Sequence, residues 1–274
     1  MADAGPQVIH RFPETKDAVR GVTLLNDELY VLRDRDVDQA DVYSTMDFTL
    51  RRCLTVPRLR GIDLQDVTSC EQKRCIYISD DGTGNTCVHR LGLDGSIRKW
   101  PVVRGSPWGL SVTRSFNLLV TCSDWSSENA IVIELSSDAG ECVREITLES
   151  VVELPWHCVQ LVSGQYLVCH GVLPNNSRVS VVSEDGRVVR SNVGDGGLRR
   201  PYHVAVDNDE FIFVAAAFHN RIVLYDTSLS YARNVVERIQ NAPWILCFDD
   251  FTRRLYVGQS DAIVLVIQLQ TPTL

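Results

Sequence analysis

The sequence predicts an all-β fold arranged as a six-bladed β-propeller. Short runs of β-forming residues alternate with turns rich in Asp, Gly, Asn and Ser, and no long stretch has helical period. One segment recurs six times along the 274 residues, at intervals of about 45 residues, which is the period of a propeller blade. With 45% hydrophobic and 23% charged residues, the chain can bury a core and is neither disordered nor fibrous.

Each unit begins with an inner strand, and the six segments start alike. They are predicted at residues 20–24, 60–64, 108–112, 156–160, 202–206 and 244–248. A second strand follows in each unit, at 29–32, 76–79, 118–121, 166–169, 212–215 and 255–258. In the second unit this strand comes late, which we attribute to an insertion around Cys70–Arg74. Third strands follow, and most units add a fourth after a turn, as four-stranded antiparallel blades require.

The last unit ends after three strands. Segment 7–12, whose alternation of apolar and polar residues is typical of a strand, precedes the first unit and has no blade of its own. An open ring would leave an exposed sheet edge, so we expect residues 7–12 to supply the missing outer strand. Residues 1–274 are therefore predicted to form a single domain, with blades starting near residues 20, 60, 108, 156, 202 and 244.

The fifth unit resembles an NHL repeat. The likeness lies in Pro201–Asp207, Phe211–Ala216 and His219–Leu224, which match the family's proline-led inner strand, its second strand and the start of its third. The resemblance implies an NHL/TolB-like propeller, as in the C-terminal domain of tripartite-motif NHL proteins. Such domains serve mainly as recognition modules: some bind single-stranded RNA, others bind proteins, and a few relatives are enzymes.

From this resemblance we predict a non-enzymatic recognition or scaffold propeller that binds a protein partner or a ubiquitin-ligase substrate. The chain has no paired Cys-x-x-Cys motifs for a RING or B-box zinc module, so it would be at most the recognition part of a ligase. Single-stranded RNA binding is the alternative, opposed by the net charge of −8. A metal-dependent hydrolase or lyase is the third and least favoured possibility.

The residues at the start of each inner strand should gather at one mouth of the central channel. The predicted binding ring consists of Arg20, Arg60, Trp108, Trp156, Tyr202 and Trp244, with Arg199 and Arg200 flanking one arc. Aromatic rings interleaved with arginines suit a platform that stacks bases or grips a peptide. The alternative is that the aromatic side chains pack between blades as wedges.

His157 and His203 occupy equivalent positions in neighbouring units and are included in the predicted binding site. Amidating lyases of similar fold bind zinc through three histidines, which alternate blades would supply most naturally. His157 belongs to the fourth blade, and the alternate blades, the sixth and the second, offer Ile245 and Gly61 at this position. We therefore expect no metal, no cofactor and no catalytic residue.

The N-terminus lacks the order of a secretory signal, and no apolar run approaches the roughly 18 residues of a membrane-spanning helix. The nine cysteines show no disulfide framework, so we expect reduced and mostly buried thiols. The chain is accordingly expected to be a cytoplasmic monomer that does not contact a membrane.

Overall fold

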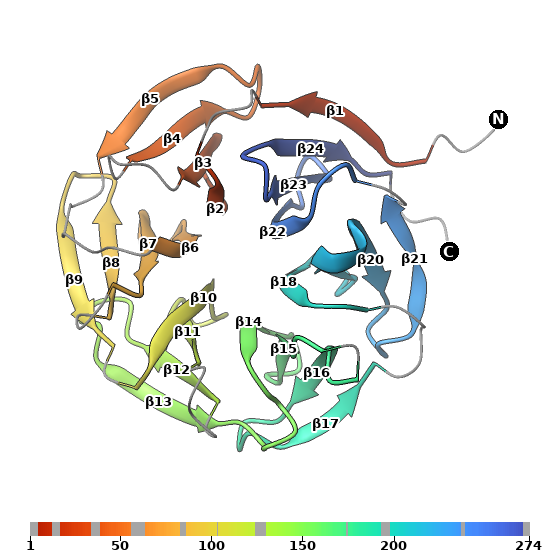
Figure 1. The fold of residues 1–274 in the computed structure, drawn as a ribbon. Helices are drawn as coiled ribbons and strands as arrows, with labels where there is room; N and C mark the ends of the chain where they lie inside the picture. The colour runs from red at the N-terminus through yellow and green to blue at the C-terminus, as the bar shows by residue number, and fades with distance from the viewer. Residues whose placement is uncertain are drawn as a thin grey trace.

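The computed structural model is a ring of six four-stranded antiparallel sheets around a central channel (Figure 1). It describes residues 5–12, 17–33, 39–55, 64–82, 86–102, 104–123, 130–173, 175–192, 198–236 and 239–270. The all-β, six-bladed fold predicted from the sequence is confirmed. No helix in the described ranges is long and apolar enough to cross a membrane.

In every blade the first three strands run outward from the channel in chain order. The inner strands are β2 (Val19–Leu25), β6 (Leu64–Cys70), β10 (Ser106–Val112), β14 (Pro155–Gln160), β18 (Pro201–Val206) and β22 (Pro243–Asp249). The second strands are β3 (Glu28–Arg33), β7 (Cys75–Asp80), β11 (Leu118–Ser123), β15 (Tyr166–His170), β19 (Ile212–Ala216) and β23 (Arg254–Gln259). The third strands are β4 (Gln39–Ser44), β8 (Cys87–Gly92), β12 (Ile131–Leu135), β16 (Arg178–Val182), β20 (Arg221–Tyr225) and β24 (Val264–Gln268).

The outer strands of the first five blades are β5 (Leu50–Thr55), β9 (Ile97–Pro101), β13 (Cys142–Thr147), β17 (Val188–Ser191) and β21 (Tyr231–Val236). A 3-10 turn, η1 (Ala217–His219), follows β19. The outer strands are largely exposed, whereas the second and third strands are buried on both faces because each blade packs between two neighbours.

The ring closes through its own ends, as predicted. Strand β1 (Gln7–Arg11) pairs antiparallel with β24 and completes the blade of β22 and β23 (Figure 1). The pairing continues one residue beyond the strand, because the Phe12 amide donates to the Val264 carbonyl oxygen at 2.9 Å. Phe12 is buried in a cluster shared by the first and last blades, so the closing segment also contributes to the core.

The predicted register of the second unit is wrong. Its inner strand is β6, Leu64–Cys70, and most of the predicted strand at 60–64, Arg60 and Gly61 included, lies outside the described residues. The segment read as an insertion around Cys70–Arg74 is the ordinary turn between β6 and β7. The correction changes which residue of this blade faces the channel.

Candidate functional site

Each inner strand has a register irregularity against its second strand near the start of the strand. In the second blade the irregularity lies between Leu64 and Asp66, as it lies between Pro155 and His157 in the fourth. Asp66, not Gly61, is therefore the counterpart of the histidines. The six equivalent positions around the channel are Gly21, Asp66, Gly109, His157, His203 and Ile245.

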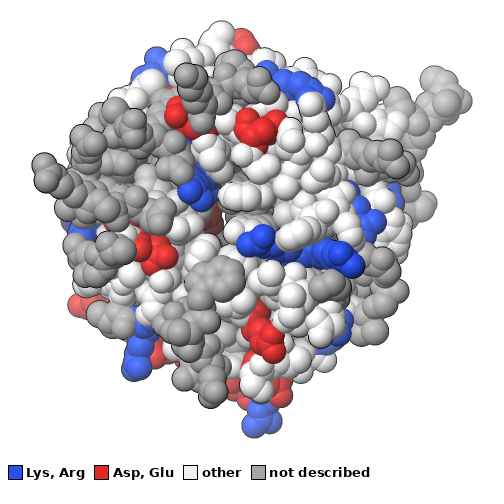
Figure 2. Space-filling model, viewed as in Figure 1, with Lys and Arg blue, Asp and Glu red and all other residues white. Residues whose placement is uncertain are grey.

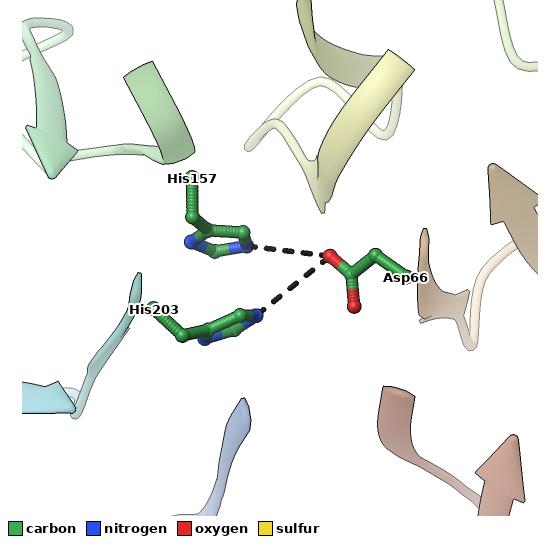
Figure 3. Close-up of side chains that lie close together, drawn as sticks. All are labelled: Asp66, His157 and His203. Carbon is green, nitrogen blue, oxygen red and sulfur yellow. Dashed lines mark ion pairs between the residues drawn. The ribbon is translucent and has the colours of Figure 1, made fainter. Parts of the chain in front are cut away.

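Asp66, His157 and His203 converge from β6, β14 and β18 although they are far apart in sequence (Figure 3). The Nε2 atoms of His157 and His203 lie 4.0 and 3.7 Å from the same carboxylate oxygen, Oδ2 of Asp66. The two imidazole rings are stacked, with centroids 3.6 Å apart and planes 24° apart. All three side chains are buried, which holds this arrangement in place.

Backbone groups of the third blade help to fix the cluster. The Leu110 amide donates to Oδ2 of Asp66 at 2.8 Å, and Nε2 of His157 donates to the Leu110 carbonyl oxygen at 3.0 Å. The other oxygen of Asp66 accepts from the Val67 amide at 2.8 Å. A glycine at 109 allows this close approach, because a Cβ there would lie 2.4 Å from the Trp156 carbonyl oxygen and 2.8 Å from the His157 Cα.

Burial sets the protonation of the cluster. It lowers the pKa of both His157 and His203 to about 3, with the neighbouring His203 lowering that of His157 further. Burial also raises the pKa of Asp66 to about 6, an effect partly offset by His157 and by the amides of Leu110 and Val67. At neutral pH the cluster therefore holds one carboxylate and two neutral imidazoles.

These shifts predict that the free energy of unfolding of metal-free protein falls as the pH drops from about 6.5 to 4. His157, His203 and His170, whose pKa burial lowers to about 4, are all less basic in the folded chain, so acid favours the unfolded chain. Asp66 has the opposite sign because its folded pKa is raised, so acid favours its folded state.

Acid lowers the free energy of unfolding through three imidazoles and raises it through one carboxyl group. We therefore expect a net fall of about 1–3 kcal/mol for each pH unit between about pH 6.5 and 4. Urea denaturation at pH 7, 6 and 5 in the presence of a chelator measures it, and His203→Gln should show a shallower slope than wild type. A stability that is flat or rising toward pH 5 would contradict the neutral assignment of these histidines.

A small cavity of about 30 Å³ lies above the cluster and opens at the mouth of the channel. It is lined by Asp66 and His203 below and by a rim that includes most of the predicted binding ring: Arg20, Gln65, Trp108, Trp156, Tyr202 and Trp244. Gln65 takes the place predicted for Arg60. The mouth thus joins aromatic side chains to the buried carboxylate and imidazole groups.

The aromatic side chains of the mouth form a continuous arc. Trp108 meets Trp156 edge-on, with ring centroids 5.1 Å apart. Trp156 stacks on Tyr202 at 4.5 Å, and Tyr202 stacks on Trp244 at 5.3 Å with planes only 6° apart. Trp156 is buried in the core between the fourth and fifth blades, whereas the other three are half-buried. The wedge interpretation therefore describes Trp156, and Tyr202 also lies between two rings, those of Trp156 and Trp244.

Arg200 lies over this arc, and Arg199 is exposed. The Arg200 guanidinium carbon is 5.6, 5.4 and 5.6 Å from the ring centroids of Trp156, Tyr202 and Phe218. Beside it lies a second cavity of about 300 Å³, lined by Arg200, Tyr202, Ala217, Phe218, Asn220, Ala242, Trp244 and Ser260. The two cavities share Tyr202 and Trp244. Figure 2 shows basic side chains bordering the central hollow of the molecule.

A second cluster of possible metal ligands, Asp80, Cys87 and His89, lies within the second blade. Nε2 of His89 is 3.1 Å from Asp80 Oδ2, and Cys87 Sγ is 3.6 Å from the same oxygen. Burial, followed by the Asp80 charge, raises the pKa of Cys87 to about 12, so its thiol stays protonated.

The same pair of strand positions holds polar partners in two other blades. Arg33 contacts Asp41 at 3.0 Å in the first blade, and His170 contacts Ser180 at 2.8 Å in the fourth. We therefore assign the contact between Asp80 and His89 a structural role, which is to join the second and third strands of its blade.

No family model and no curated protein matches this sequence. Solved structures do match over nearly the whole chain. Virginiamycin B lyase from Staphylococcus aureus has a TM-score of 0.68 at 11% identity, covering 97% of this chain and 100% of that one. A streptogramin B lyase gives 0.67 at 10% identity, covering 94% and 95%. A catalytically inactive histidine-to-alanine variant of the S. aureus lyase with quinupristin gives 0.68 at 11% identity, covering 97% and 99%.

These neighbours correct the prediction of function. The sequence predicted a non-enzymatic scaffold that binds proteins or RNA, on the model of NHL domains. That prediction is contradicted by these three solved propellers, which cover 94–97% of the chain and are lyases, hence enzymes. At 10–11% identity the likeness itself shows the six-bladed propeller fold alone. The particular reaction of this chain must be argued from its own residues.

Proposed function

We propose that this chain is an enzyme of the lyase type, with its reaction centre at the Asp66–His157–His203 cluster in the channel mouth. The observation that carries the proposal is the convergence of three titratable side chains from three blades beneath an open cavity. Functional sites are where burial shifts pKa values and polar groups converge in a concave pocket. The solved lyases of the same fold support an enzymatic use of the scaffold.

The cluster offers the chemistry that a lyase needs. A lyase breaks a bond by elimination, which requires a group that accepts a proton and one that stabilises the charge developing on the substrate. At neutral pH the cluster has an ionised carboxylate and two uncharged imidazoles, because burial holds the pKa of Asp66 near 6 and those of the histidines near 3. These groups can accept a proton directly, or they can hold a metal ion that polarises the substrate.

The 300 Å³ cavity beside Arg200 is of a size that accepts a small organic molecule. Its aromatic walls, Tyr202 and Trp244, suit a planar apolar group, and Arg200 suits an anionic substituent such as a carboxylate. Tyr202 and Trp244 also line the smaller cavity that Asp66 lines, and we propose that the reacting group of a bound ligand extends from the larger cavity into the smaller one. We therefore propose as substrate a planar organic molecule that carries an anionic group.

Two further proposals concern the protein family of the chain and its cellular compartment. The likeness of the fifth unit, residues 201–224, to NHL repeats supports placing the chain among NHL-like propellers. Six of the nine cysteines are buried thiols, which supports work in a reducing compartment such as the cytoplasm.

Turnover of a substrate panel tests the proposed activity. The panel comprises aryl esters, lactones, planar aromatic carboxylates and quinupristin, each incubated with the purified protein and followed by mass spectrometry of the products. We expect at least one aromatic member to be converted. Arg200→Ala should raise the KM for that member about tenfold with little change in kcat, because Arg200 binds the substrate rather than the reacting atoms.

The matched control is Arg187→Ala, which removes an exposed arginine on the opposite face. It should leave both constants unchanged. If folded wild-type protein converts no member of the panel, the proposed reaction class is wrong. If Arg187→Ala and Arg200→Ala have equal effects, the assigned substrate cavity is wrong.

A further inference from the structure

We propose that Asp66, His157 and His203 together bind a divalent transition-metal ion, with Zn²⁺ as the first candidate. The inference deepens the proposed function and rests on it for the role of the ion, whereas binding itself is measured without turnover. Two imidazoles and one carboxylate are a donor set that divalent transition metals accept, as in His₂-carboxylate zinc sites. Mg²⁺ and Ca²⁺, which prefer oxygen ligands, fit it poorly.

The geometry suits one small ion. One donor atom from each of the three side chains can be chosen so that all lie within 4.8 Å of one another. With bonds of about 2.0–2.2 Å, a tetrahedral ion separates its ligand atoms by about 3.4 Å. The distances of 4.0 and 3.7 Å from the two Nε2 atoms to Asp66 Oδ2 thus need to shorten slightly, and the two stacked rings need to tilt apart so that both nitrogens point at one ion. Figure 3 shows both rings directing these nitrogens at that oxygen.

The charge of the cluster also favours a cation. The Asp66 carboxylate is buried and lies within 4.0 Å of an imidazole nitrogen of both His157 and His203. Burial of a carboxylate is costly, and a bound cation would offset that cost. Arg20 lines the same cavity as Asp66.

The cavity leaves room for an open coordination position. Its volume of about 30 Å³ above Asp66 and His203 exceeds the roughly 10–15 Å³ that one water molecule needs. Catalytic metal sites keep such a position for water or substrate, whereas structural sites are closed. The ion would therefore face the mouth through which a substrate enters.

Binding of the metal ion would replace one existing contact of His157. Nε2 of His157 donates to the Leu110 carbonyl oxygen, so binding there would move the ring proton to Nδ1, which has no partner within the described residues. This rearrangement opposes binding. We accordingly expect affinity in the micromolar range rather than that of a closed structural zinc site.

Calorimetric titration of chelator-treated, reduced full-length protein with Zn²⁺ tests the proposal. We expect one ion per chain and a higher melting temperature in its presence. His203→Gln should weaken binding about 100-fold or more, since even outer partners of metal ligands are worth about 10–100-fold. His89→Gln, in the other cluster, should bind Zn²⁺ as wild type does, and millimolar Mg²⁺ should not compete.

Co²⁺ provides a second measurement on the unaltered protein. Bound to Asp66, His157 and His203, it should show visible d–d bands without the intense near-ultraviolet band of thiolate-to-cobalt charge transfer. A strong thiolate band would assign the metal to cysteines such as Cys87 and overturn the proposal, as would the absence of stoichiometric Zn²⁺ binding.

The two proposals fail separately. Turnover that persists in excess chelator, from protein that binds no Zn²⁺, would overturn the metal site and leave the enzyme standing. Stoichiometric Zn²⁺ binding at these residues without turnover of any panel member would support the metal site and overturn the proposed enzymatic activity.

Discussion

Replacing Trp156 with alanine should lower the free energy of unfolding by about 3–5 kcal/mol, the usual cost of deleting a buried aromatic side chain. Trp156 is only 4% exposed and lies in the apolar cluster that joins the fourth and fifth blades. Its indole Nε1 also donates to the Gly171 carbonyl oxygen at 3.1 Å, which would lose this donor. The substitution removes both the packing between two blades and a buried hydrogen bond.

Urea denaturation of the variant measures this loss. Phe251→Ala is the matched control: Phe251 is 97% exposed, so its truncation should change stability by less than about 0.5 kcal/mol. A loss below about 1 kcal/mol for Trp156→Ala would show that the ring does not hold the two blades together. The contribution of the neighbouring Tyr202 and Trp244 to packing between blades would then have to be measured in the same way.

The architecture could be predicted because it depends on repetition. Six similar strand starts at nearly constant intervals specify the number of blades, and the unpaired strand at 7–12 accounts for the missing outer strand of the last blade. The same repetition placed Trp108, Trp156, Tyr202 and Trp244 at one mouth, where their rings meet. Strand period and spacing are local properties, so a single sequence contains them.

The candidate site was harder to predict, because one blade was aligned out of register. The Arg60-Gly61 start looks like Arg20-Gly21, so Gly61 was taken as the channel residue and Asp66 was missed. One signal could have corrected this. The number of residues from Asp66 to the second strand of its blade equals the number from Ile245 to the second strand of the sixth blade, so no insertion is needed. With Asp66 in place, the two histidines have a third partner.

Other features depend on distances that a sequence does not contain. The stacking of His157 on His203, and the approach of both to Asp66, requires the close passage of β14 along Gly109. Burial then determines which groups are charged. The non-enzymatic function was carried over from a family resemblance, and it failed because one propeller fold supports both recognition and catalysis.

The kcat/KM of Asp66→Asn, on whichever panel substrate the wild type converts, tests the central claim most directly. Asparagine keeps the size of the side chain but removes the buried carboxylate toward which both imidazoles point. A direct proton acceptor and a metal ligand would both be lost, so we predict a fall of about 100-fold or more. Asp185→Asn, an exposed aspartate on the opposite face, is the control and should retain wild-type activity. If Asp66→Asn folds and keeps kcat/KM within about twofold of wild type, the reaction centre does not lie at Asp66, and the assignment is wrong.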